Sequence, residues 1–229
     1  MKMAVRYCFL ISALLASSAA YCGEVALAGG DYGNVSIKVT SLKEARFRTT
    51  IRQQYDYSCG SAAAATLLTY QYNHPVTEQD VFQSMWDQGD KEKIRLEGFS
   101  LLDIKRYLEQ KGYEADGYEA PLDKLIQVGI PAITLIRDNG YNHFVVIKGL
   151  NDREVLAGDP SMGSRIIPRA EFEKLWINRI LFVVHSDQSK AVFNNRHDWH
   201  IREMAPLGLA MNSSSLANIT LLRPGANDF

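Results

Sequence analysis

The order of apolar and polar residues predicts helices in the first half of the chain and strands in the second. Residues 59–72 are small or apolar almost throughout, which indicates a buried helix that His74-Pro75 ends. Apolar residues three and four positions apart predict two further helices, at 77–86 and 101–110. Each of these two begins at a Thr or Ser, the residue types that cap helix N-termini.

Beyond residue 120 the pattern becomes that of strands. Asp138-Asn139-Gly140 is a turn signal between two runs rich in Val, Ile and Leu, and predicts a hairpin. We also predict short helices at 121–128 and 170–176. The predicted strands are 131–136, 141–150, 155–157, 165–167 and 180–184. Helices followed by an antiparallel sheet define an α+β domain.

The first 20 residues are organised like a secretory signal peptide. Lys2 and Arg6 precede an apolar run at 8–16, and small residues follow as far as Ala20. The run is shorter than the roughly 20 apolar residues that a spanning helix needs. We therefore predict that residues 1–20 are a cleaved signal peptide, that the protein is exported to the periplasm, and that no transmembrane anchor remains.

The rest of the chain divides into three segments. Residues 21–44 are predicted to be a flexible, Gly-rich leader that ends in a strand at 35–39, and residues 45–185 form the main domain. Residues 186–229 are a C-terminal extension of different composition. This extension either packs on the domain as an extra edge or serves as an arm that docks a partner, and the sequence leaves both alternatives open.

Composition narrows the range of partners and cofactors. The 229 residues carry a formal net charge of −1, which gives no reason to expect nucleic acid as a partner. Cys8 leaves with the signal peptide, and the remaining Cys22 and Cys59 are too few for a disulfide scaffold. His197 and His200 have no third ligand near them in the sequence, so no metal or other cofactor is predicted.

Cys59 is the first candidate for chemistry because it opens the predicted helix at 59–72. A thiol there faces unpaired backbone N–H groups and the positive end of the helix dipole, and both favour the thiolate. Ser58 is placed to be the N-cap, and Gly60 allows a substrate backbone to approach closely. A free cysteine is more often a small buried hydrophobe, so the assignment depends on partner residues.

Three other residues supply what cysteine catalysis requires. His143 opens a strand-like run, Asp159 follows another, and Gln53 lies shortly before Cys59. An imidazole accepts the thiol proton, a carboxylate fixes the imidazole tautomer, and an amide donates to the oxyanion. Taken singly they are an ordinary strand-edge histidine, turn aspartate and loop glutamine. Together and in this order they indicate a cysteine peptidase.

With these residues the chain resembles the peptidase family C39, papain-like cysteine peptidases best known for cutting bacteriocin precursors after a double glycine. The family pattern is a Gln six residues before Cys-Gly, then a His followed by a hydrophobic strand, then Asp-Pro, and it covers about residues 45–185 here. The resemblance implies a papain-like fold with four catalytic residues: Cys59 as nucleophile, His143 as base, Asp159 as orienter and Gln53 as oxyanion donor. Gln54 is the alternative donor if the loop register differs by one.

The chain departs from the best-known family members in two respects. Those are fused to an ATP-driven exporter, whereas this sequence has no Gly-x-x-x-x-Gly-Lys-Ser/Thr motif, so ATP is not expected as a ligand. They also act on the cytoplasmic side of the membrane, whereas this protein is predicted to be exported, so double-glycine specificity is not carried over to it. A stand-alone exported member is similar to the accessory peptidases of bacterial fibre systems, such as functional amyloid. The similarity implies cleavage of a secreted protein or peptide at a Gly-rich or small-residue site, with a fibre subunit or a component of a secretion machine as partner.

Two alternatives complete the hypotheses from sequence. A silent C39-like domain would bind a leader or fibre subunit without cutting it, but such domains usually lack the cysteine that this chain retains. Separately, Leu27-Ala28-Gly29-Gly30 has the form of a double-glycine cleavage site. It makes self-trimming before Asp31 a hypothesis, although Gly pairs are also common in linkers.

Overall fold

The computed structural model describes residues 23–29 and 33–201, with side chains from residue 40 onward. The chain divides into two units, one ending at Ser41 and one beginning at Leu42. Residues 1–20, Cys22 and the proposed self-trimming site after Gly30 lie outside the described residues, so the predictions for them stay predictions. No helix within the described residues has the length and apolar content needed to cross a membrane.

The first unit contains an antiparallel hairpin of β1 (Gly23–Gly29) and β2 (Gly33–Val39). Strand β2 contains the strand predicted at 35–39. Strand β1 corrects the prediction of a flexible leader, because Gly23 to Gly29 are paired one by one with Val39 to Gly33. The small residues and glycines of this segment obscured an alternation of Val25 and Leu27 that is typical of a strand.

The second unit is built on a six-stranded sheet with the order β3-β8-β4-β5-β6-β7, in which every pair of neighbours is antiparallel. The hairpin predicted around Asp138-Asn139-Gly140 joins β4 to β5, and Asn139 and Gly140 adopt the positive φ angles of 50° and 84° that such a turn requires. The strands are β3 (Ala115–Glu119), β4 (Ala132–Asp138), β5 (Tyr141–Leu150), β6 (Glu154–Asp159), β7 (Gly163–Pro168) and β8 (Ile180–Val184).

The helices confirm most of the sequence predictions. The helix predicted at 59–72 is α2 (Cys59–Thr66), which continues as a π-helical turn through Gln71. Ser100 closes a capping box with Asp103 at the start of its helix. The other helices are α1 (Leu42–Arg46), α3 (Glu78–Gln88), α4 (Lys91–Glu97), α5 (Leu101–Gln110), α6 (Asp123–Val128) and α7 (Arg169–Leu175), and short 3-10 helices occupy Gln188–Lys190 and Arg196–Trp199.

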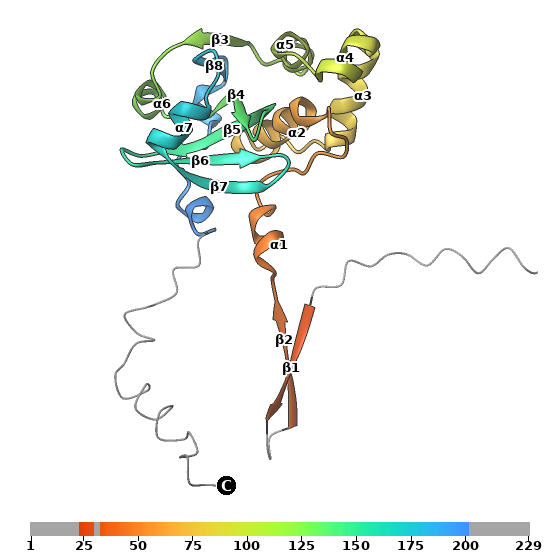
Figure 1. Ribbon diagram of the computed structural model, residues 1–229, viewed down its shortest axis with the longest axis vertical. Helices are drawn as coiled ribbons and strands as arrows, with labels where there is room; N and C mark the ends of the chain where they lie inside the picture. Colours follow the sequence, from red (N-terminus) through yellow and green to blue (C-terminus); the bar gives the residue numbers. More distant parts are fainter. Residues whose placement is uncertain (1–22, 30–32, 202–229) are drawn as a thin grey trace, which may run out of the picture. The chain divides into compact units, whose positions relative to one another are not determined.

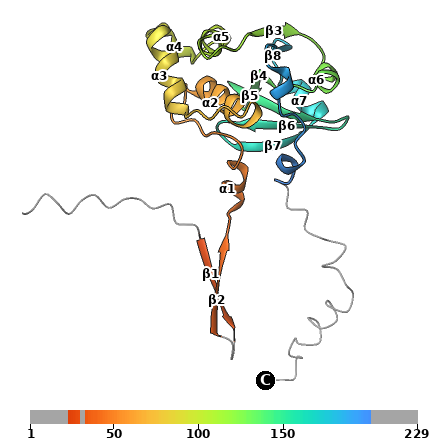
Figure 2. The same ribbon diagram turned by 180° about the vertical axis from the view of Figure 1, so that it is seen from behind.

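The sheet separates two hydrophobic cores, because successive residues of a strand point to opposite faces. On β5, Phe144 and Val146 pack with α2, α3 and α5, whereas Val145 and Ile147 pack with α6 and α7. Figures 1 and 2 show α2 to α5 gathered on one side of the sheet and α6 and α7 on the other. This three-layer α+β arrangement confirms the predicted fold class and buries α2 against the strand that carries His143.

The first part of the C-terminal extension packs on the domain. The Asn194 side chain accepts a hydrogen bond from the Leu150 N–H at 2.7 Å and donates one to the Leu150 carbonyl at 3.0 Å. It therefore pairs with the backbone at the end of β5. Asp198 forms a 2.9 Å ion pair with the fully buried Lys148. Of the two alternatives left open by the sequence, packing therefore holds for residues 186–201, and residues 202–229 lie outside the described part.

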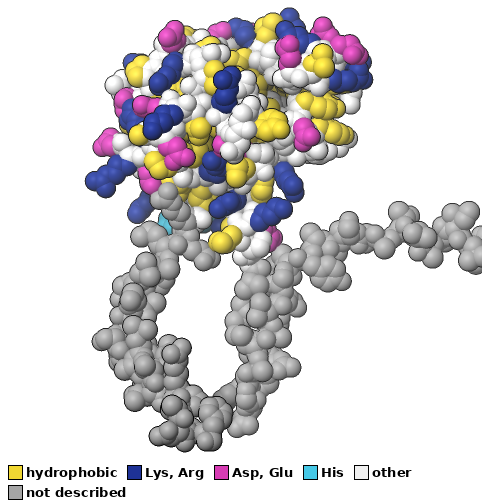
Figure 3. Space-filling view, in the orientation of Figure 1, with side chains coloured by type: hydrophobic (Ala, Val, Ile, Leu, Met, Phe, Trp, Pro, Cys, Tyr) yellow, Lys and Arg dark blue, Asp and Glu magenta, His cyan; other side chains and the backbone are white. Residues whose placement is uncertain are grey.

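Apart from β1 and the two short 3-10 helices, three elements were not predicted, and each lacks a periodic apolar pattern. In α4 only Ile94 is buried, and in the edge strand β3 only Ala115 is. Helix α1 has no buried residue at all. On the face of the molecule seen in Figure 3, basic and acidic side chains are interspersed rather than gathered into an area of one sign.

Candidate active site

Strand pairing places His143 beside Asp159. Val146 pairs with Gly158 across β5 and β6, so the end of β6 runs alongside the start of β5. The His143 Nε2 atom lies 3.1 Å from Oδ2 of Asp159. When Nε2–H donates to this carboxylate, the other ring nitrogen, Nδ1, carries the lone pair and is free to accept a proton. The structure therefore brings together the two residues predicted to be base and orienter, which lie 16 positions apart in the chain.

The Asp159 carboxylate is fully buried, and both of its oxygens accept hydrogen bonds. Its Oδ1 atom accepts from the Ser161 N–H at 2.8 Å, the Ser161 hydroxyl at 2.7 Å and the Met162 N–H at 3.1 Å. Burial alone raises the pKa of Asp159, but hydrogen bonds from His143 and Ser161 outweigh it and hold this pKa far below its ordinary value. The group is therefore a permanent anion at neutral pH.

Helix α2 packs its first turn on β5, so that Cys59 and Phe144, the residue after His143, belong to the same hydrophobic cluster. The backbone N–H groups of Phe144 and of Gly60 act on the Cys59 sulfur, and both lower the pKa of its thiol. Ser58 occupies the N-cap position but makes no side-chain cap. Its hydroxyl instead exchanges hydrogen bonds with the backbone of Tyr55, and this fixes the loop that leads into the helix.

The pKa shift of Cys59 differs from the sequence prediction. Burial raises the pKa of the Cys59 thiol, and the nearby Asp159 charge adds to this, while the N–H groups of Phe144 and Gly60 oppose it. Burial is the largest of these effects, so the net shift raises the pKa of the thiol, in the direction opposite to the one that the helix N-terminus favours. The helix N-terminus acts in the predicted direction but is the smaller effect.

The Gln53 side chain is half-buried and Gln54 is exposed, which distinguishes the two glutamines. The Gln53 N–H donates to the carbonyl of Pro160 at 3.0 Å, so its loop is tied to the residue after Asp159. Its side-chain Nε2 donates to the Tyr55 carbonyl at 3.0 Å and, over a longer 3.4 Å, to that of Asp56. Its Oε1 is buried and has no hydrogen-bond partner in the part of the chain that the structure describes.

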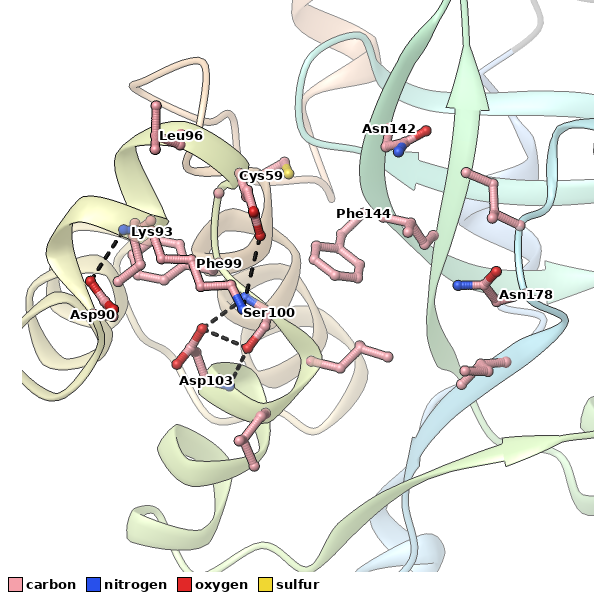
Figure 4. A pocket seen from close by; sticks show the side chains of 18 of the residues that line it. Cys59, Asp90, Lys93, Leu96, Phe99, Ser100, Asp103, Asn142, Phe144 and Asn178 are labelled. Atoms are coloured by element: carbon pink, nitrogen blue, oxygen red, sulfur yellow. Dashed lines mark hydrogen bonds and ion pairs between the residues drawn. The ribbon is translucent and has the colours of Figure 1, made fainter.

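Cys59 lines a groove of about 790 Å³ between the helical layer and the sheet. Figure 4 shows Leu96 and Phe99 on the helical wall, and Asn142 and Phe144 on the wall formed by β5. Asn178 belongs to the segment before β8, where Asn178 and Arg179 both have positive φ angles. The groove has an apolar floor with charged residues of both signs at its rim: Asp90, Lys93, Glu97, Asp103 and Arg106.

Arg165 is a residue at the site that the sequence analysis did not identify. Its Nη1 atom lies 3.1 Å from Oδ2 of Asp159, the same oxygen that His143 contacts, and 2.8 Å from Oδ2 of Asp138. In the sequence it is one polar residue at the start of a short strand, and such residues usually face solvent. No local signal reveals that it meets a buried carboxylate.

A cysteine at the start of a buried helix, packed on the antiparallel sheet that carries a histidine–aspartate pair, is the arrangement of a cysteine peptidase with a papain-like fold. The chain belongs to the peptidase C39 family, whose model matches residues 48–188. The match ends within the first turn of the C-terminal extension and includes Gln53, Cys59, His143 and Asp159.

Similar proteins agree with this assignment. The chain is 44% identical over 170 residues to the "Probable functional amyloid protease FapD" of Pseudomonas aeruginosa, covering 74% of each chain. It is 39% identical over 172 residues to the protein of the same name from Pseudomonas fluorescens, covering 75% of this chain and 76% of the relative. The fold is similar to the crystal structure of the peptidase domain of Streptococcus ComA, a bifunctional ABC transporter, with a TM-score of 0.51 and 16% identity over 59% of this chain and 96% of that one.

Proposed function

We propose that the protein is an exported cysteine endopeptidase in which Cys59 is the nucleophile, His143 the base and Asp159 its orienter. The observation that carries the proposal is the bond from His143 Nε2 to Asp159, which leaves Nδ1 for the thiol proton. Because burial raises the pKa of the Cys59 thiol, we infer that His143 removes its proton as the sulfur attacks the peptide carbonyl.

The oxyanion formed by this attack needs hydrogen-bond donors, and we assign them to Gln53 and the Cys59 N–H. The Gln53 amide carries two N–H bonds. Its Nε2 atom lies 3.0 Å from the Tyr55 carbonyl and 3.4 Å from that of Asp56, and we infer that the longer contact is the one given up for an oxyanion. His143 then protonates the leaving amine, and water hydrolyses the thioester to release the acid and restore the thiol.

We propose that the substrate is a secreted protein, cut within a segment of small residues. Phe99, which lines the groove, packs so closely on Gly60 that a Cβ atom at position 60 would lie 2.9 Å from the Phe99 Cβ, and we infer from this that the groove wall stands close to the nucleophile. Bulky side chains at the cut would meet this wall. The naming of the two Pseudomonas relatives as probable functional amyloid proteases favours a fibre subunit, or a component of its secretion machine, as the substrate.

Comparing protein termini in cells of the source organism tests this function. We expect neo-N-termini in exported proteins of cells that carry the wild-type gene, and their loss when the gene encodes Cys59→Ala. The control is Tyr141→Ala, which removes an exposed side chain two residues before His143 on the same strand and should leave the cleavage unchanged. Identical termini in wild-type and Cys59→Ala cells would favour the non-cutting binding domain, and Cys59-dependent termini confined to cytoplasmic proteins would refute export.

A further inference from the structure

Asp159 Oδ2 is shared between two cationic or potentially cationic partners. The His143 ring and the Arg165 guanidinium each lie 3.1 Å from this oxygen, while Oδ1 is filled by Ser161 and Met162. The carboxylate therefore has no freedom to turn away from His143 without losing the Arg165 contact as well. A guanidinium cannot lose its charge in the accessible pH range, so this contact is permanent.

Arg165 also reaches the hairpin that carries His143. Its Nη1 atom is 2.8 Å from Asp138, the last residue of β4, whose partner across the hairpin is Tyr141 at the start of β5. The side chains of Arg165 and Asp138 are only 20% and 18% exposed, so solvent screens this contact less than it would a surface ion pair. One side chain from β7 thus joins the end of β6 to the turn before His143.

We propose that Arg165 is a positioning residue of the site, holding the Asp159 carboxylate against the His143 ring and fixing the β4–β5 hairpin on which that ring is carried. This inference rests on the proposed function. It adds an electrostatic consequence, because Arg165 places a positive charge at the oxygen that also stabilises the imidazolium. Asp138 offsets part of that charge, so Arg165 and Asp138 act on His143 in opposite directions.

The charged and titratable groups that face His143 come from four elements. Asp159 of β6 contacts His143 directly, and Arg165 of β7 contacts the same Asp159 oxygen. Asp138 of β4 contacts Arg165, and the Cys59 thiol of α2 is close enough to Asp159 for its pKa to be raised by that charge. Arg137 lies next to the hairpin turn, and its Nε–H donates to the Asn142 side-chain oxygen at 2.9 Å. Replacing Arg165 removes a positive charge from this set, and replacing Asp138 removes a negative one.

Labelling of Cys59 by iodoacetamide in the full-length protein, followed by intact mass over a range of pH, tests the proposal without a substrate. The rate should rise with pH as His143 becomes able to accept the thiol proton. In Arg165→Gln this rise should move to higher pH by about one unit, because Arg165 and His143 share one carboxylate oxygen and a charge that close shifts a pKa by roughly one to three units. In Asp138→Asn, which removes the negative charge paired with Arg165, the rise should move to lower pH. On the acidic side, Arg165→Gln should then label about tenfold more slowly than wild type. Arg165→Lys keeps the positive charge but not the planar guanidinium with its several N–H donors. It should retain the wild-type midpoint of the labelling rate against pH.

Opposite shifts in the two variants support the positioning role, since a general loss of structure would not move the midpoints in opposite directions. Midpoints that coincide with wild type in both variants, or that move the same way, overturn it. If Arg165→Gln does not fold, Asp138→Asn and Arg165→Lys decide the question alone. Failure of the catalytic proposal is distinguished by its own test, because there the Cys59→Ala cells would keep the wild-type termini.

Discussion

Replacing Asp198 with Asn should destabilise the protein strongly, because Asp198 neutralises a lysine in the interior. Lys148 is fully buried, and its Nζ atom lies 2.9 Å from Asp198 Oδ2. The same ammonium donates to the Thr49 carbonyl at 2.8 Å and to the Thr49 hydroxyl at 2.6 Å. The pair therefore joins the segment before α2, strand β5 and the C-terminal extension.

The magnitude follows from burial. Removing one partner of a buried ion pair leaves an uncompensated charge and costs about 3–5 kcal/mol, and both partners here are at most 6% exposed. For a protein of about 150–250 residues, each kcal/mol lowers the melting temperature by roughly 2–4 °C. We therefore expect Asp198→Asn to melt about 6–20 °C below wild type at pH 7.

The pH dependence gives a second test with a defined sign. Burial lowers the pKa of Lys148, and the charge of Asp198 opposes this, so Asp198→Asn lowers the folded-state pKa further. Below the unfolded-state value of about 10.4, the unfolded chain then binds more protons than the folded one, and stability rises with pH. The deficit of Asp198→Asn should therefore shrink between pH 7 and pH 10.

Thermal unfolding followed by circular dichroism is the assay. The matched control is Glu92→Gln, which removes an exposed carboxylate that is ion-paired to Arg95 and should leave the melting temperature nearly unchanged. The double variant Lys148→Met/Asp198→Leu should recover most of the loss, because no charge is left buried. A melting temperature of Asp198→Asn equal to that of Glu92→Gln would refute the reasoning.

Three further predictions concern single contacts. Gly60→Ala should cost about 1–3 kcal/mol in thermal unfolding and slow Cys59 labelling, since its Cβ would lie 2.9 Å from Phe99 Cβ; unchanged values would show that the α4–α5 connection yields freely. Asn194→Ala should cost about 1–3 kcal/mol in the same assay, because it leaves the Leu150 N–H and carbonyl unpaired, and an unchanged melting temperature would mean that water replaces the amide. The pKa of Asp159 is held far below its ordinary value although burial opposes this, so the contribution of Asp159 to stability is present above about pH 4 and is lost as the pH falls further. Wild type should therefore lose more stability between about pH 5 and pH 2 than Asp159→Asn does. Parallel curves of stability against pH for the two proteins would contradict this.

Local patterns in the sequence were sufficient to predict the helices and strands that bury an apolar face. The capped helix at Ser100 and the hairpin at Asp138-Asn139-Gly140 were predicted because their signals lie within a few residues. Helix α4 and strand β3 were not, since each buries one side chain and owes its place to its neighbours. The proximity of His143 to Asp159 follows from strand register, which the sequence alone does not specify.

The properties that depend on packing were the ones that sequence reasoning missed or reversed. The helix N-terminus predicted a thiolate at Cys59, but the sign of the shift is set by how deeply α2 is buried against β5. Arg165 and Lys148 read as ordinary strand residues, and only the assembled sheet brings them to Asp159 and Asp198. Each of these contacts joins residues that lie on different elements of the fold.

The measurement that tests the central claim most directly is the rate of Cys59 alkylation by iodoacetamide in wild type and in His143→Ala. If His143 accepts the thiol proton, wild type should react at pH 7 at least tenfold faster than the variant. The variant, left with a thiol whose pKa burial raises, should gain reactivity only above the ordinary thiol value of about 8.5. Rates that coincide across this pH range would contradict the assignment of His143 as the base for Cys59.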